Sequence, residues 1–378
     1  MKKIFAVMAL FGGLTLAAAD PYFDATIRRV DVGGEVLSYA NITVPTRAFN
    51  NTFARLAKIA GREEPSARSA FNAILKLLDL TSFKAIAHSS VEVEPKFFVY
   101  KDFVRIDSSS ESIFGPKAFT NCQINYLNLP ADTRLALMLN INFSYIWKRI
   151  NDEVAATGDQ KIIHAFNDIK AEAMKEGFNI DKIIESINGP VFLLVTGESI
   201  ADLKVLVFVS DKSGVISTEL RKVFPTQDGE KVAPVKGLPL PGAQNAQLIY
   251  GNECVVFVSD PKILTPEKKL GDLPRYQKYS TKLPKEGFAM LLVDMSQPFA
   301  DTITALLPEE AQNFLKLKPF SITVVETSYP DGIGAVAASS FSVPMCIFNS
   351  LENFLNIALD VAEKQSAPTE TKPAPAFK

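Results

Sequence analysis

Three separate segments of this chain follow the same order of residue types, and this order limits the folds that the chain can adopt. Each segment begins with an apolar run of strand length that ends in Asn or Asp, continues with an apolar and a short polar residue, and passes into an amphipathic helix. The segments span residues 34–56, 133–150 and 287–307. The short polar residues suit helix N-caps, because their side-chain oxygens accept hydrogen bonds from unpaired N–H groups; they are Thr43, Asn142 and Ser296. The pattern predicts repeated units in which a strand leads into a capped helix.

The pentapeptide VFVSD occurs twice, at residues 207–211 and 256–260, and raises the question of a duplicated active site. In one interpretation, Asp211 and Asp260 are paired catalytic carboxylates or metal ligands, which requires them to be close in space. In the other, each Asp follows a strand and caps the next helix, where it complements the partial positive charge of the helix N-terminus. Capping accounts for both copies without any contact between them, so we predict the structural role.

The remaining periodicities indicate an α+β protein. Apolar residues recur at helical spacing in three further segments, residues 66–78, 159–176 and 351–364. The helix of the first repeated unit carries an apolar stripe that is expected to face a core, formed by Phe49, Phe53, Leu56 and Ile59. Strand-like runs flank a hairpin turn signal at residues 329–332. We therefore expect a curved, mainly antiparallel sheet, or more than one, with amphipathic helices packed on one face.

The first residues predict export from the cell. Two lysines, a short apolar run and Ala17-Ala18-Ala19 before Asp20 are typical of a secretory signal peptide at residues 1–19, and a retained anchor helix is the alternative. We expect a periplasmic or extracellular protein in three further parts. These are an N-terminal α+β lobe at 20–128, a larger α+β lobe with the C-terminal helix at 129–365, and a disordered Pro-rich tail at 366–378.

Charge and hydropathy argue against several classes of partner. The chain has 40 basic and 42 acidic residues, and removal of the leader would leave 38 basic residues against 42 acidic ones. This mild acidity argues against binding to nucleic acid and to anionic membrane surfaces, since both favour basic patches. After the leader, no apolar run approaches the length of a transmembrane helix.

Three cysteines, Cys122, Cys254 and Cys346, offer at most one disulfide within the chain. An oxidising compartment would permit such a bond and would leave one thiol over. The sequence does not choose the pair, and the spacings resemble no metal motif. Buried inert thiols, a single disulfide and a functional thiol therefore stay open as alternatives.

Residues of the usual catalytic kinds are scarce. His88 lies in a strand-like run and His164 in a helix, and both are expected at the surface. The sequence contains no G-x-S-x-G elbow, H-E-x-x-H motif, Walker loop or G-x-G-x-x-G motif. We therefore predict no catalytic, cofactor-binding or metal-binding residues and no cofactor. The lone Trp147 is expected in the core or, as the alternative, in the wall of an apolar pocket.

Several sequence blocks carry a resemblance to a known group of proteins. They are TSFKAIAHSS at 81–90, LPADT at 129–133, INGPVFLLVTGES at 187–199, LKVLVFVSDK at 203–212 and LPRYQKYSTKLPKEGFAMLLVD at 273–294. Together they resemble a family of large exported bacterial proteins that is known only as a domain of unknown function. The resemblance implies an exported bacterial protein of similar architecture, and it brings no activity and no functional residues with it.

Three functions follow as hypotheses. In the first, an exported non-enzymatic protein binds an apolar ligand or a component of the cell envelope, as the phenylalanine-rich composition indicates. In the second, the protein has a structural or interaction role in the cell envelope. In the third, a hydrolase uses an unrecognised acidic site, which requires two carboxylates in one cleft and a pKa that burial has raised. The sequence favours the first most and the third least.

Overall fold

A computed structural model of the chain describes residues 20–30, 33, 36–227, 230–236, 245–306 and 319–342. Fourteen strands lie within these residues. They are β1 Val36–Asn41, β2 Phe83–Glu94, β3 Phe97–Ile106, β4 Cys122–Gln123, β5 Thr133–Leu139, β6 Val191–Thr196, β7 Lys204–Ser210, β8 Val232–Pro234, β9 Gln247–Tyr250, β10 Cys254–Val258, β11 Glu286–Gly287, β12 Ala289–Met295, β13 Phe320–Tyr329 and β14 Gly332–Ser339.

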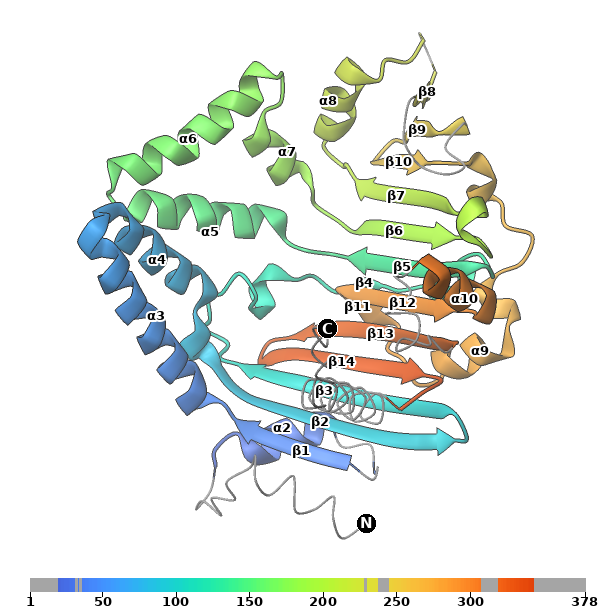
Figure 1. Ribbon diagram of the computed structural model, residues 1–378, viewed down its shortest axis with the longest axis horizontal. Coiled ribbons are helices and arrows are strands. Elements are labelled where there is room, and N and C mark those ends of the chain that lie inside the picture. Colours follow the sequence, from blue (N-terminus) through green and yellow to red (C-terminus); the bar gives the residue numbers. More distant parts are fainter. Residues whose placement is uncertain are drawn as a thin grey trace, which may run out of the picture.

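Twelve of these strands form one sheet in the order β1-β2-β3-β14-β13-β12-β5-β6-β7-β10-β9-β8 (Figure 1). Every neighbouring pair in it is antiparallel. The α+β class and the antiparallel sheet are therefore confirmed. Because β3 pairs with β14, which comes more than 200 residues later in the chain, a single sheet runs through both predicted lobes.

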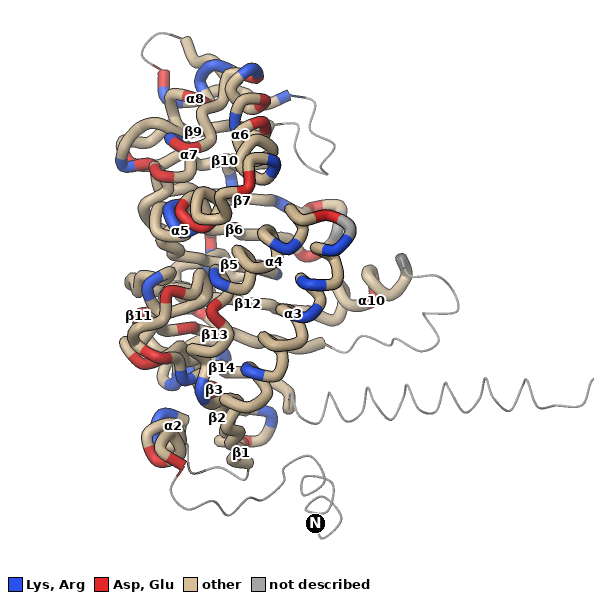
Figure 2. Tube along the Cα trace, turned by 90° about the vertical axis from the view of Figure 1, so that its left-hand side faces the viewer, with Lys and Arg blue, Asp and Glu red and all other residues tan. Residues whose placement is uncertain are grey.

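The helices occupy three places around the sheet. They are α2 Phe23–Val30, α3 Thr43–Glu63, α4 Pro65–Leu78, α5 Phe143–Ala156, α6 Gln160–Lys175, α7 Ile180–Ser186, α8 Val215–Val223, α9 Pro274–Ser280 and α10 Gln297–Leu306. Short 3-10 helices are η1 Leu80–Ser82, η2 Pro116–Ala118, η3 Tyr126–Asn128, η4 Ile200–Asp202, η6 Pro261–Leu264 and η7 Leu270–Asp272. Helices α3 to α7 gather beside one end of the strands (Figure 1), while α2 and α10 lie on opposite sides of the sheet (Figure 2).

Two hydrophobic clusters share one face of the sheet. Phe97 and Val99 belong to a large central cluster and Phe103 to a smaller one, and the alternation of side chains along β3 places all three on the same face. The segment from η6 to α9 covers the central cluster, and α2 covers the smaller one through Val30. This part of the fold has the expected packing of helices on one face.

A third cluster lies on the opposite face, towards the β8 edge. Val258 belongs to the central cluster and Val255 to the third one, and residues three apart on a strand point to opposite faces. Helix α8 covers this cluster with Ile216. Both faces of the sheet are therefore covered, but at different places along it.

The apolar stripe of α3 does not face a core. Phe49, Leu56 and Ile59 are 49%, 47% and 60% exposed. Phe53 is half-buried, and its ring centroid lies 4.5 Å from that of Phe49. The prediction that this stripe is buried is wrong, because α3 packs on α4 and leaves the stripe exposed, while the buried Ala57 lies about 100° round the helix from Leu56.

The three predicted helix caps have different outcomes. Asn142 is the N-cap of α5, and its side chain accepts the N–H of Tyr145 at 3.0 Å. Thr43 is instead the first residue of α3, and its N–H donates to the Asn41 side chain at 3.0 Å. The Ser296 hydroxyl is buried and has no hydrogen-bond partner within the described part of the chain. The internal repeat therefore stays a prediction.

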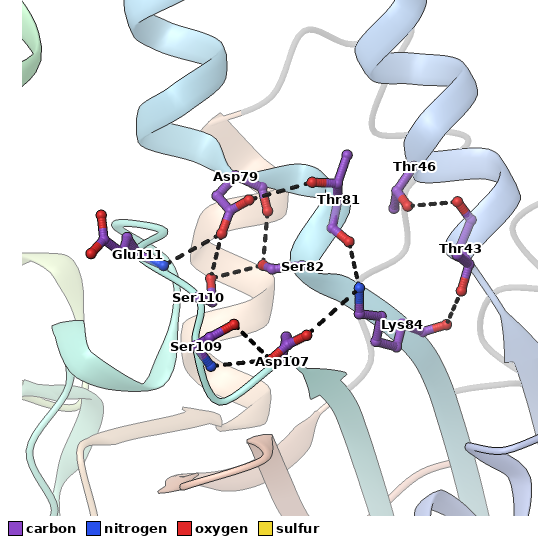
Figure 3. A network of polar contacts seen from close by, with 10 residues as sticks. All are labelled: Thr43, Thr46, Asp79, Thr81, Ser82, Lys84, Asp107, Ser109, Ser110 and Glu111. Atoms are coloured by element: carbon purple, nitrogen blue, oxygen red, sulfur yellow. Dashed lines mark hydrogen bonds and ion pairs between the residues drawn. The ribbon is translucent and has the colours of Figure 1, made fainter.

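A polar network ties the end of α4 to the sheet (Figure 3). Asp79, the C-cap of α4, has a φ of 42°, a left-handed conformation that is costly for a residue with a Cβ. Its carboxylate accepts the Ser110 hydroxyl at 2.9 Å, and its carbonyl oxygen accepts the Ser82 hydroxyl at 2.8 Å. Because Ser82 precedes β2 and Ser110 follows β3, the network fixes the helical group relative to the sheet.

Some predictions concern residues outside the described ones. These are the signal peptide at 1–19, the C-terminal helix at 351–364, the tail at 366–378 and Cys346. Within the described ranges, no helix has the length and apolar character that crossing a membrane would require.

Candidate functional site

Two adjacent pockets lie at one end of the strands, and helices α3 to α7 lie beside the other end. The first has a volume of about 590 Å³ and the second about 420 Å³, and both are lined by Ala131, Arg134 and Leu273. We call the two pockets together the strand-end groove. Its charged lining residues are Lys96, Asp132, Arg134, Glu198, Lys204, Lys262, Glu267, Lys268, Arg275 and Asp294.

Antiparallel pairing brings these residues together from distant parts of the sequence. Leu135 on β5 pairs with Val293 on β12, so Arg134 and Asp294 are the next cross-strand neighbours towards the groove. On the other side of β5, Thr196 at the end of β6 pairs with Lys204 at the start of β7. The groove is thus built where the starts of some central strands meet the ends of their neighbours.

Asp294 is a buried carboxylate in the wall of the second pocket. Its Oδ2 accepts a hydrogen bond from Arg275 Nη2 at 2.6 Å and one from the Tyr276 hydroxyl at 2.9 Å. Arg134 Nη1 lies 3.9 Å from the same oxygen. A carboxylate so far removed from water needs such partners, because an unpaired buried charge is strongly destabilising.

Tyr276 supplies a neutral donor to this carboxylate. Its side chain is fully buried, and burial, followed by the nearby Asp294 charge, raises the pKa of its phenol well above the usual value. The phenol therefore stays protonated and donates to Asp294. Arg275 lies over the ring of Tyr276, with its guanidinium carbon 4.8 Å from the ring centroid, so α9 positions both partners of Asp294.

Arg134 has unused hydrogen-bonding capacity and lines both pockets. Its Nε donates to the carbonyl oxygen of Gly197 at 2.7 Å, and 11% of its side-chain surface is exposed. A guanidinium carries five N–H donors in a fixed plane. The two terminal nitrogens of Arg134 have no hydrogen-bond acceptor among the residues that the structure describes, and such donors suit the planar oxygens of a carboxylate or phosphate.

A tight turn after β6 holds the partner of Arg134 in place. Gly197 has a φ of 133°, and a Cβ added there would lie 2.9 Å from the carbonyl oxygen of Asp202. The Asp202 carboxylate accepts the backbone N–H of Glu198 at 3.0 Å and that of Ser199 at 2.6 Å. Burial raises the pKa of Asp202, but these hydrogen bonds and that of the Ser199 hydroxyl outweigh it and lower the pKa to about 2.

The groove is more basic than the chain as a whole. Six of its lining residues are Lys or Arg and four are Asp or Glu, whereas the whole chain has a formal charge of −2. The ion pair between Asp294 and Arg275 uses one residue of each sign and leaves five basic and three acidic lining residues. The local charge therefore favours a ligand that carries a negative group.

The two VFVSD copies do not form a common site. Strands β7 and β10 are antiparallel and pair Ser210 with Cys254, so Asp211 and Asp260 follow opposite ends of this pair. Six residues of extended chain separate Cys254 from Asp260, which corresponds to about 20 Å. The interpretation of Asp211 and Asp260 as paired catalytic carboxylates or metal ligands is therefore wrong.

Both aspartates make the capping contacts that the structural interpretation predicts. The buried Asp211 carboxylate accepts the N–H groups of Ile216 at 3.2 Å and Ser217 at 2.7 Å in the first turn of α8. Asp260 is the N-cap of η6 and accepts the N–H of Lys262 at 2.9 Å.

The other residues considered from sequence lie apart from the groove. His88 is half-buried on β2, with its Nδ1 2.7 Å from Asp102 Oδ1, and His164 is exposed on α6. Cys122 and Cys254 are free thiols, so they do not pair with each other, and burial raises the pKa of Cys122. Trp147 is half-buried in the helical group, where its Nε1 donates to Asp181 at 2.8 Å.

The described residues contain no group of three or more His, Cys, Asp or Glu side chains that could hold a metal ion.

The sequence did not identify Arg134, Arg275 and Tyr276 as residues of a site. Arg134 lies near the start of β5 and Asp294 near the end of β12, and strand pairing alone makes them neighbours.

Comparisons with protein-family models, with curated proteins and with solved structures found no match for this chain. The resemblance of several sequence blocks to exported bacterial proteins therefore stays a prediction.

Proposed function

We propose that this protein is a non-enzymatic binding protein whose strand-end groove receives a ligand with a carboxylate or phosphate group. The observation that carries this proposal is Arg134, which lines both pockets and has terminal N–H groups that no described residue accepts. Arg275 and the rim lysines Lys204 and Lys262 add positive charge around it. A guanidinium fixed by Gly197 is already oriented, so binding costs little side-chain entropy.

The charged lining changes the kind of ligand that we expect. An apolar ligand would favour a pocket lined mainly by apolar and aromatic side chains. In the groove, ten charged residues surround Leu273, Ile263 and a few other apolar groups. A ligand with a polar, anionic head and a small apolar part fits this lining better than a wholly apolar one.

The groove supports the hydrolase hypothesis less than it supports the binding of an anionic ligand. It requires a carboxylic acid whose pKa is raised by burial and which lies beside a second carboxylate. Burial does raise the pKa of Glu326, but this residue lines neither pocket. Asp294, the buried acid of the groove, is instead held by Arg275 and Tyr276.

The signal peptide predicted at residues 1–19 supports a binding function outside the cytoplasm, in the periplasm or the extracellular space. The ligand would then be a nutrient, a metabolite or an envelope component that bears an anionic group. Native mass spectrometry of the chain purified gently from its own cells would detect such a ligand as a reproducible additional mass. Its value would separate a small anion from a lipid.

A direct test uses inorganic phosphate and citrate as probes, with the thermal midpoint of unfolding and calorimetry as readouts. A bound probe should raise the midpoint of the wild-type chain. Arg134→Gln should weaken the binding by about tenfold or more, because a hydrogen bond to a charged group is lost. The exposed rim variant Lys262→Gln should weaken it without affecting the core.

The matched control is Lys212→Gln, an exposed lysine that follows the opposite end of β7 from the groove. This variant should bind the probes like the wild type. The proposal fails if neither probe binds, or if Arg134→Gln and Lys262→Gln both keep wild-type affinity.

A further inference from the structure

Helix α3 is a long helix with an exposed apolar stripe. Phe49, Leu56 and Ile59 are about half exposed or more, and the spacing of 7 and 3 residues places them along one side of the helix. Ala57 is buried and lies about 100° round the helix from Leu56. A stripe of large apolar side chains on a folded helix indicates a surface that binds something.

A basic stripe runs beside the apolar one. Arg47, Arg55, Lys58 and Arg62 are all exposed, and Figure 2 shows basic positions along α3. None of the four forms an ion pair with a residue that the structure describes. At about 100° per residue, they occupy the sector next to Ile59. The helix thus combines four basic residues with the single acidic Glu63, in a chain whose formal charge is −2.

We propose that α3 binds an anionic lipid surface, with its apolar stripe inserted at the headgroup boundary and its basic stripe in contact with the lipid charges. Interfacial helices have this combination of an apolar face with Phe and Leu and a neighbouring face rich in Lys and Arg. The acidic net charge of the whole chain argues against binding to an anionic membrane, but it averages over the entire surface. The charge that a membrane meets is that of α3 itself.

The attachment of α3 to the sheet supports a docking role. The N–H of Ile42 donates to the carbonyl oxygen of Lys84 at 2.9 Å. The Thr43 hydroxyl donates to the same oxygen at 3.4 Å, as Figure 3 shows. The Thr46 hydroxyl donates to the Ile42 carbonyl oxygen at 2.8 Å. These contacts hold the first turn of α3 on β2, so docking of the helix would fix the orientation of the whole sheet on the surface.

Charge complementarity favours a lipid surface over a second copy of the chain. A symmetric contact between two α3 helices would bring two sets of four basic residues together across one interface. Like charges in such a contact are repulsive. An anionic surface instead neutralises the basic stripe while it covers the apolar one.

The test measures flotation of the full chain with vesicles of phosphatidylcholine alone and of phosphatidylcholine mixed with phosphatidylglycerol. We expect binding to the mixed vesicles that weakens as salt rises. Phe49→Ser with Leu56→Ser should lower the partition coefficient by about tenfold or more. Arg55→Gln with Lys58→Gln should also lower it, by a factor that shrinks at high salt.

The matched control is Ile169→Ser with Met174→Ser, two apolar residues of α6 that are 64% and 53% exposed. This variant should float like the wild type, and all three double variants should keep the wild-type circular dichroism, since the residues changed are exposed. The proposal is overturned if the chain does not bind the mixed vesicles, or if the α3 variants bind as well as the control. It is also overturned if Phe49→Ser with Leu56→Ser abolishes a dimer in solution, because the stripe would then be a contact between copies.

Discussion

Arg134 and Asp294 face each other across the β5–β12 pair, with 3.9 Å between Nη1 and Oδ2, although 160 positions separate them in the sequence. Arg275 and Tyr276, which complete the site, come from α9. The central strands β5 and β12 and the helix α9 therefore meet at one buried carboxylate, that of Asp294. We therefore expect changes at Asp294 to affect stability as well as the proposed binding in the groove.

Replacement of Asp294 by Ala should destabilise the protein. The change leaves the fully buried Tyr276 hydroxyl without its acceptor and removes the negative partner of Arg275. We expect the free energy of unfolding to fall by about 2–3 kcal/mol in urea denaturation. Asp294→Asn keeps the shape and one acceptor oxygen, so its loss should be smaller. Equal stability of Asp294→Ala and the wild type would contradict this view of the site.

Gly197 should tolerate no side chain. Its φ of 133° and the short distance to the Asp202 carbonyl oxygen mean that Gly197→Ala would distort the turn that supports Arg134. We expect a loss of about 2 kcal/mol in unfolding free energy, together with weaker binding in the groove. Gly158→Ala is the control, because Gly158 has a φ of 62° with nothing within 4 Å of an added Cβ. The Gly158→Ala variant should lose about 1 kcal/mol in unfolding free energy and should bind in the groove like the wild type.

The Asp202 turn should lose its stabilising effect in acid. The folded pKa of about 2 lies below the unfolded value of about 3.9, so the ionised carboxylate stabilises the folded state above about pH 4. This contribution should disappear as the pH falls from about 4 to about 2. Carbon NMR titration of the Asp202 carboxyl should give the low pKa directly. In urea denaturation, the difference between the wild type and Asp202→Asn should shrink over the same range, and a constant difference would contradict the assignment.

Local elements could be predicted from the sequence because local residue patterns determine them. The periodic segment at 159–176 contains α6, and the one at 66–78 is α4, which begins one residue earlier at Pro65. The hairpin signal at 329–332 joins β13 to β14. The cap at Asn142 is also local, since its partner is Tyr145 in the next turn.

The arrangement of the elements could not be predicted in the same way. Nothing near β3 or β14 in the sequence indicates that they pair, because each strand carries only its own alternation. The helical spacing of Phe49, Leu56 and Ile59 predicts a shared side but not whether that side meets protein or solvent. The groove depends on both kinds of information, so its central contact between Arg134 and Asp294 has no local signal.

The two VFVSD aspartates should differ in their effect on stability, although their local sequences are identical. Asp211→Ala leaves the N–H groups of Ile216 and Ser217 without a buried acceptor, and we expect a loss of about 2–3 kcal/mol in unfolding free energy. Asp260→Ala removes one cap contact, to Lys262, and should cost about 1 kcal/mol. Urea denaturation of both variants measures the difference, with Asp211→Asn as the control that keeps one acceptor oxygen. Equal losses would contradict the larger role that the two backbone contacts and the burial of Asp211 predict for it.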